Sequence, residues 1–119
     1  MLFKSVLTLL AVGAVSAGVF HTTLKSSSPE KDSAGGSPTS VTLTFTDRVN
    51  AAVSSIAILK PDSSEVAKLV VKPTKDPATI TGALEKPLPI GGYIVRYRTA
   101  SNDGHAVRGA FAFTVSTAK

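Results

Sequence analysis

The residues best suited to chemistry lie together in Ser101-Asn102-Asp103-Gly104-His105, between two stretches with the alternating pattern of strands. The segment holds one of only two histidines in a chain of 119 residues. In an extended backbone, residues two apart point to the same face, so Asp103 and His105 are expected to lie side by side. A carboxylate oxygen beside an imidazole nitrogen suits a divalent metal that accepts mixed ligands, and copper(II) is a leading candidate.

The same segment has a plainer interpretation as a connection between strands. Asp103-Gly104 is typical of a turn, and a single histidine near a strand end is usually a surface residue. A hydrolase triad of Ser101, Asp103 and His105 is disfavoured, because triad groups converge from separate elements in a defined order of hydrogen bonds.

The other histidine, His21, offers a further ligand. A first strand that begins at His21 and lies beside the last strands brings its imidazole near Asp103 and His105. Two nitrogens and one oxygen form the in-plane set that tetragonal copper(II) prefers. Both imidazoles must be neutral to bind, so the copper affinity is expected to fall below about pH 6.5.

The composition removes several classes of function. The chain has no cysteine, which excludes thiolate sites for zinc, iron–sulfur clusters or blue copper, and its one methionine is Met1. The formal net charge is +5, but the basic residues are scattered along the strands and are not interleaved with aromatics. Nucleic acid is therefore not an expected partner.

Residues 1–17 have the pattern of a secretory signal peptide. Lys4 precedes an apolar run over 6–15, which is shorter than the roughly 20 residues that span a bilayer. Small residues favour cleavage after Ala17 or Gly18, with residue 20 as the latest site, and an uncleaved anchor is the weaker alternative. We expect an exported protein, periplasmic or secreted, whose domain covers 21–119.

The rest of the chain predicts an all-β antiparallel sandwich of about seven short strands, because alternating segments follow one another with turn residues between them. The segment 27–38 is predicted to be a loop and 72–78 an edge or a connection. The expected strands are 21–26, 41–46, 53–59, 66–71, 79–84, 93–99 and 107–115.

Four segments together resemble the CopC-type copper resistance proteins. The start of the expected domain follows the pattern His-x-x-Leu-x-x-Ser-x-Pro, and the closing part follows Ser-x-Asp-Gly-His-x-x-x-Gly with an aromatic residue after it. Two intervening segments are similar as well, with Tyr97 where the family commonly has tryptophan. The segments are 21–29, 41–49, 88–97 and 101–113.

The resemblance implies a small immunoglobulin-like or cupredoxin-like Greek-key β-sandwich that binds one copper(II) ion. It implies a carrier or buffer in copper resistance or homeostasis, and not an enzyme. His21, Asp103 and His105 stand at the positions of the family's ligands, and Asp47 stands where an acidic residue orients an imidazole. A membrane copper transporter of the CopD type is the implied partner, and we expect a monomer.

The chain also departs from the family pattern. Thr23 replaces a second histidine, Arg48 replaces a proline, and no methionine-rich copper(I) loop is present. The α-amine of His21 is a ligand only if the mature chain starts at His21. A start at Val19 would instead place His21 third from the free amine, an arrangement that itself chelates copper(II). Two alternatives stay open: an immunoglobulin-like interaction module without metal, and copper-dependent oxidative catalysis, which the small size of the chain disfavours.

Overall fold

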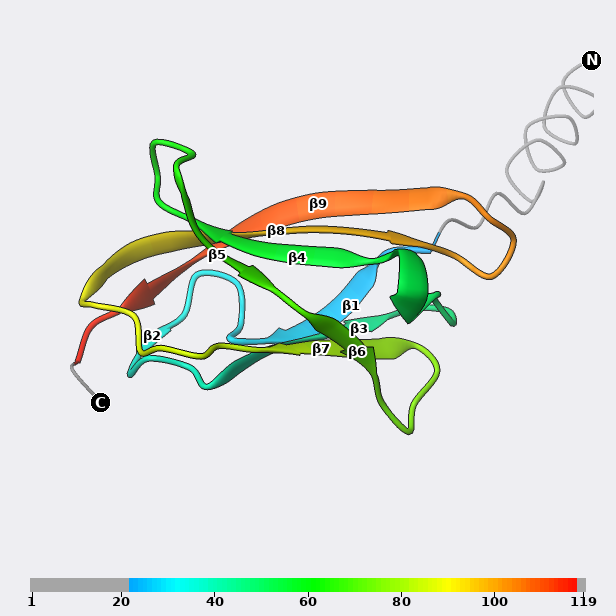
Figure 1. Cartoon of the computed structure of the whole chain (residues 1–119), viewed down its shortest axis with the longest axis horizontal. Coiled ribbons are helices and arrows are strands. Elements are labelled where there is room, and N and C mark those ends of the chain that lie inside the picture. The colour runs from blue at the N-terminus through cyan, green and yellow to red at the C-terminus, as the bar shows by residue number, and fades with distance from the viewer. Residues whose placement is uncertain (1–21, 118–119) are drawn as a thin grey trace, which may run out of the picture.

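The alternating segments pair into two sheets that pack face to face, as Figure 1 shows for the computed structural model, which describes residues 22–117. The four-stranded sheet has the order β1-β3-β7-β6 and the five-stranded sheet the order β2-β9-β8-β4-β5. The strands are β1 (Leu24–Ser28), β2 (Ala34–Gly35), β3 (Ser40–Phe45), β4 (Ser55–Leu59), β5 (Glu65–Leu69), β6 (Val71–Pro73), β7 (Thr79–Ala83), β8 (Gly91–Ala100) and β9 (Ala106–Val115).

This arrangement confirms the predicted all-β sandwich. All strand pairs are antiparallel except β2 with β9, which is parallel. No helix among residues 22–117 is long and apolar enough to cross a membrane. The predicted signal peptide, 1–17, and the predicted domain start at His21 lie outside the described residues.

The structure corrects three of the predicted elements. The predicted strand 66–71 is two strands, because the chain leaves the five-stranded sheet after β5 and enters the other sheet as β6, with Val70 exposed between them. The predicted loop 27–38 contains the end of β1 and the short strand β2. The start of the predicted strand 53–59 is instead the last residue of a single 3₁₀ turn, η1 (Ala51–Val53), in which the amide of Ala52 donates to the side chain of Asn50.

The core lies between the sheets and follows the predicted alternation. Val41, Leu43 and Phe45 of β3 are fully buried against residues of the long β8–β9 hairpin. The Phe45 and Tyr97 rings meet edge to face, with their centroids 5.7 Å apart. This packing fixes the hairpin relative to β3, and so fixes the end of the sandwich at which the hairpin turns.

Candidate metal centre

The candidate site lies at the tip of the β8–β9 hairpin. The two strands pair along their whole length up to Ala100 opposite Ala106. The amide of Gly104 then donates to the carbonyl of Ser101, and the amide of Ser101 donates to the carbonyl of His105, both at 2.9 Å. Gly104 has a φ of 90°, a conformation that costs glycine little. The tip is therefore a short loop of three residues closed by a glycine.

Asp103 and His105 lie side by side, as predicted, but not for the predicted reason. Asp103 is a turn residue, and the hairpin tip, not an extended strand, brings the two groups together. Oδ2 of Asp103 lies 3.0 Å from Nδ1 of His105. The imidazole is 85% exposed and the carboxylate 66%. With a proton on Nδ1 donated to the carboxylate, the Nε2 lone pair is available to a metal.

Ser101 holds the other oxygen of this carboxylate. Its hydroxyl donates to Oδ1 of Asp103, which also accepts the amide of His105 at 3.2 Å. The hydroxyl of Ser101, followed by the His105 amide, lowers the pKa of the Asp103 carboxyl to about 2. Asp103 is consequently an anion over the whole range in which proteins are normally folded.

The same contacts argue against a hydrolase triad. A triad needs a hydrogen bond from the serine hydroxyl to an imidazole nitrogen. Here the Ser101 hydroxyl donates to Asp103, and Nδ1 of His105 faces the other oxygen of that carboxylate. The order is serine, carboxylate, imidazole, which leaves the hydroxyl with no base to activate it.

The beginning of the described chain lies in the same pocket. Thr22 and Asp47 line a pocket of about 200 Å³ together with Asp103 and His105. The amide of Thr23 donates to Oγ1 of Thr46 at 3.0 Å, and the amide of Thr46 donates to the carbonyl of Thr23 at 2.9 Å. In Figure 1, β1 accordingly begins at the end of the sandwich where β8 turns into β9.

Asp47 follows β3 and Thr46 directly in the chain, and it lines this pocket. Its Oδ1 accepts the amide of Arg48 at 2.8 Å, which fixes the direction of the carboxylate. The carboxylate that holds the His105 ring is that of Asp103. Asp47 lines the pocket together with Thr22.

His21 lies outside the described residues, so the predicted third ligand has no described position. Among residues 22–117, no three histidine, cysteine or acidic side chains gather in an arrangement that holds a metal ion. The part of the chain that the structure describes thus brings together two side chains of types that bind metals, Asp103 and His105.

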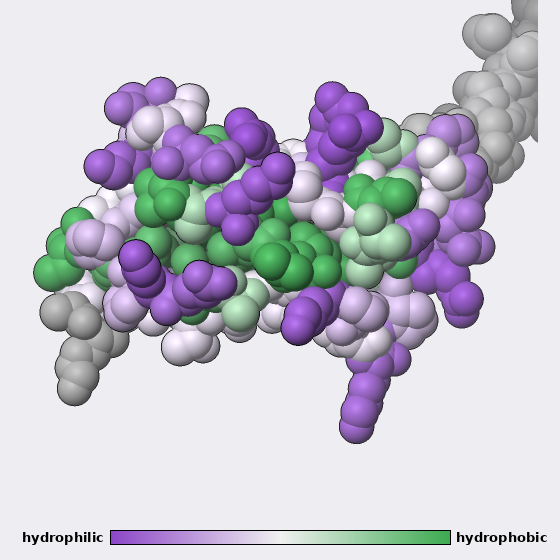
Figure 2. Space-filling model, viewed as in Figure 1, coloured by the Kyte–Doolittle hydropathy of each residue, from purple (hydrophilic) through white to green (hydrophobic). Residues whose placement is uncertain are grey.

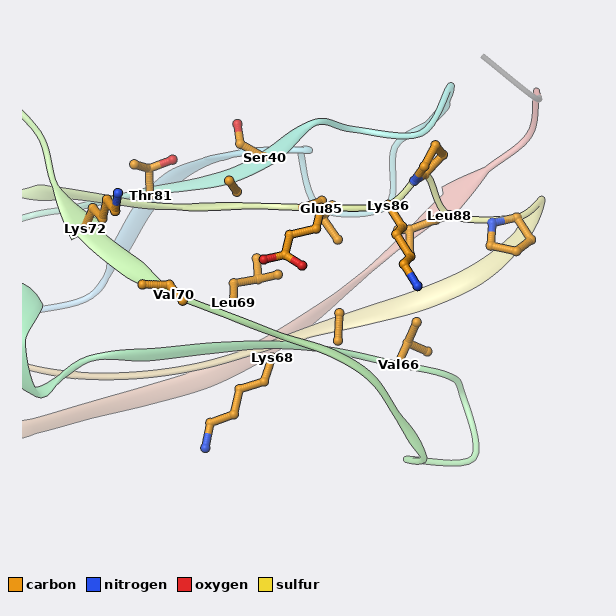
Figure 3. A pocket seen from close by; sticks show the side chains of 15 residues that line it. Ser40, Val66, Lys68, Leu69, Val70, Lys72, Thr81, Glu85, Lys86 and Leu88 are labelled. Atoms are coloured by element: carbon orange, nitrogen blue, oxygen red, sulfur yellow. The ribbon is translucent and has the colours of Figure 1, made fainter.

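The broad apolar groove of the molecule is not this site. Figure 2 shows apolar side chains gathered along the middle of one face, with polar residues around them. The groove measures about 740 Å³ and runs between β5 and the segment 84–89. Glu85 and Lys86 reach from that segment toward β5, while Lys68 points away (Figure 3). Its only acid is Glu85 and it has no histidine, so it lacks the ligand types that hold a transition metal.

Sequence reasoning missed the role of Ser101 and the anchoring pair of Thr23 and Thr46. In the sequence, Ser101 stands out as a triad candidate and as part of the family motif, although a serine two residues before an aspartate is also well placed to bond its carboxylate within a turn. The Thr23–Thr46 contact joins residues 23 positions apart, and no local pattern signals it.

Fold and site together define a small β-sandwich protein with an exposed carboxylate–imidazole pair at one end. The CopC domain model matches residues 24–116, and the chain belongs to this family. It is 33% identical to copper resistance protein C of Escherichia coli, over 97% of this chain and 98% of the relative. It is 29% identical to copper resistance protein C of Xanthomonas campestris pv. juglandis, over 95% and 97%.

Solved structures of the family have the same fold. CopC from Methylosinus trichosporium OB3b matches with a TM-score of 0.73 at 36% identity, covering 81% of this chain and 94% of the other. PcoC of Escherichia coli, described as a methionine rich copper resistance protein, matches with a TM-score of 0.68 at 31% identity, covering 82% and 100%. These similarities confirm the predicted family and the predicted sandwich.

Proposed function

We propose that this protein is an exported copper(II)-binding protein that carries or buffers one copper ion in copper resistance or homeostasis. The observation that carries the proposal is the exposed pair of Asp103 and His105, which shares one small pocket with Thr22 in a chain of the CopC family. Relatives of this chain are named copper resistance proteins, which favours a metal role over an immunoglobulin-like interaction module.

The proposed ligands are His21, Asp103 and His105. Thr22 lines the pocket, and consecutive Cα atoms lie about 3.8 Å apart, so the residue before Thr22 starts within reach of the pair. An imidazole from His21 completes a set of two nitrogens and one oxygen, which suits copper(II). We assign Asp47 to orienting the His21 imidazole, because Asp47 lines the pocket together with Thr22, the residue that follows His21.

Copper(II) is favoured over copper(I) by the ligand types that the chain contains. It has no cysteine and one methionine, Met1, which belongs to the proposed signal peptide of residues 1–17. PcoC, by contrast, is described as methionine rich. We therefore assign a single site for one copper(II) ion. The α-amine of His21 can be a further ligand of this ion only if the signal peptide is cleaved directly before His21.

We place the protein outside the cytoplasm, as a monomer that exchanges copper with a membrane transporter of the CopD type. We assign a role in transport or storage. A hydrolase is disfavoured because the hydroxyl, carboxylate and imidazole at the site are not arranged for nucleophilic attack, and oxidative catalysis is disfavoured by the small size of the chain. No binding to nucleic acid is expected, because the positive charges are scattered.

Native mass spectrometry of the exported protein with added copper(II) tests this function. The wild-type protein is expected to retain one copper, and its mass gives the cleavage site. His105→Ala and Asp103→Ala should bind copper more weakly and retain less of it, while Asp62→Ala is the matched control, since Asp62 bonds its neighbour Ser64. A wild-type protein that retains no copper would refute the proposal and favour the interaction module.

A further inference from the structure

We infer that Ser101 is a positioning residue of the copper site, which holds Oδ1 of Asp103 so that Oδ2 alone is presented to the metal. The inference rests on the proposed function. Its structural basis is the division of contacts within one carboxylate: Oδ1 accepts from the Ser101 hydroxyl and from the amide of His105, whereas Oδ2 accepts only the exposed imidazole.

The group that holds Oδ1 is fixed to the body of the protein. Ser101 is 7% exposed, although it lies at the end of a hairpin. Its amide donates to the carbonyl of His105 at 2.9 Å, and it forms a bridge with Val49 on the neighbouring segment. Its hydroxyl also lies 3.3 Å from the carbonyl of His105. Backbone contacts on both sides therefore keep this hydroxyl in place.

The group that faces Oδ2 is free to turn. The His105 side chain is 85% exposed, and its ring is held by the one hydrogen bond to Asp103. Because Nδ1 points at Oδ2, the lone pair on Nε2 points away from that oxygen. Imidazole and carboxylate bind the same ion only after the ring has turned. This movement breaks one exposed hydrogen bond and leaves both bonds to Oδ1 intact.

The consequence is a carboxylate that binds through one oxygen. Bidentate binding requires both oxygens to face the ion, and Ser101 keeps Oδ1 facing the protein. A single oxygen occupies one corner of the square that copper(II) prefers, whereas calcium accepts bidentate carboxylates. Ser101 thus contributes to the selectivity of the site as well as to its affinity, since a preorganised ligand loses less freedom on binding.

A double-mutant cycle separates this role from a general effect on folding. Ser101→Ala is expected to weaken copper(II) binding about 10- to 100-fold, the usual effect of removing a group that orients a ligand. In the Asp103→Ala background the same change should have no further effect, because Ser101 acts through that carboxylate. Ser101→Thr keeps the hydroxyl and should retain wild-type affinity. Ser54→Ala is the matched control, as Ser54 bonds Thr99 and the carbonyl of Asn50.

The readouts are the copper(II) dissociation constant, the thermal midpoint of each metal-free variant, and X-ray absorption at the copper edge of the wild-type protein. The inference is supported if copper is bound through one carboxylate oxygen and if Ser101→Ala weakens copper binding only in the protein that keeps Asp103. Equal losses in both backgrounds, or a bidentate carboxylate in the wild-type protein, would overturn it. Absence of copper binding by the wild-type protein would instead refute the proposed function itself.

Discussion

The placement of the chain start beside the hairpin tip can be tested at Thr46. Its hydroxyl accepts the amide of Thr23 at 3.0 Å and helps to hold Thr22 in the pocket with Asp103 and His105. Thr46→Val keeps the shape of the side chain and removes the acceptor. The reciprocal bond from the Thr46 amide to the Thr23 carbonyl remains, so the chain start is loosened and not released.

The size of the effect follows from that one hydrogen bond. Its net contribution is about 0.5–1 kcal/mol, the lower part of the usual range, because both partners are exposed. If His21 is a ligand, copper binding must then order the chain start at this additional cost. Since 1.4 kcal/mol changes a dissociation constant tenfold, the affinity for copper(II) should fall about 2- to 5-fold.

The assay is competition for copper(II) against a chelator of known affinity, with the wild-type protein and three variants compared side by side. Thr42→Val is the matched control. Thr42 lies on β3 away from the pocket, and its hydroxyl bonds the hydroxyl of Thr81 on β7. This control variant should change the unfolding free energy but not the copper affinity. If His21→Ala weakens binding and Thr46→Val does not, the chain start reaches the copper without this anchor and the reasoning is wrong.

Two further predictions concern stability. Gly109→Ala should destabilise the fold by about 1–3 kcal/mol in thermal unfolding, because the added Cβ would lie 2.8 Å from Cζ of buried Tyr97. Gly92→Ala is the control and should be close to neutral, since its added Cβ would lie 3.8 Å from the nearest atom, Cγ of Pro61. Equal midpoints for both variants would contradict the packing argument. The pKa of the Asp103 carboxyl, about 2 against 3.8 in the unfolded chain, means that its stabilisation is complete above pH 3.8 and is lost as the pH falls toward 2. NMR titration should show this pKa, and Ser101→Ala should raise it; an unchanged value in the variant would rule out the assigned cause.

Much of the fold was predictable because buried and outward-facing residues alternate along its longest strands. Val41, Leu43 and Phe45 mark one face of β3, and the long strands β8 and β9 repeat this pattern. The exceptions are segments in which side-chain pattern does not decide the pairing. Val70 and Val71 continue an apolar run, yet the chain changes sheets there, and β2 pairs with β9 through backbone hydrogen bonds that no side-chain pattern signals.

The site was predictable in its membership and not in its geometry. The residue types of Asp103 and His105 indicated a mixed nitrogen and oxygen site, and the two side chains do meet. Their contact, however, depends on a glycine-closed turn instead of strand alternation. The part played by Ser101 follows from its burial and from the direction of its hydroxyl, which only the folded chain reveals.

The two halves of the proposed copper site are held with unequal strength, and this bears on how the ion is released. One half, the hairpin tip, is continuous with paired strands and with buried Ser101. The other half is the chain start beside Thr22. The next residue, Thr23, is held to Thr46 by two hydrogen bonds near the surface. Local opening begins where few buried contacts oppose it. If His21 is a ligand, a partner that draws away the chain start would remove that ligand while leaving Asp103 and His105 in place.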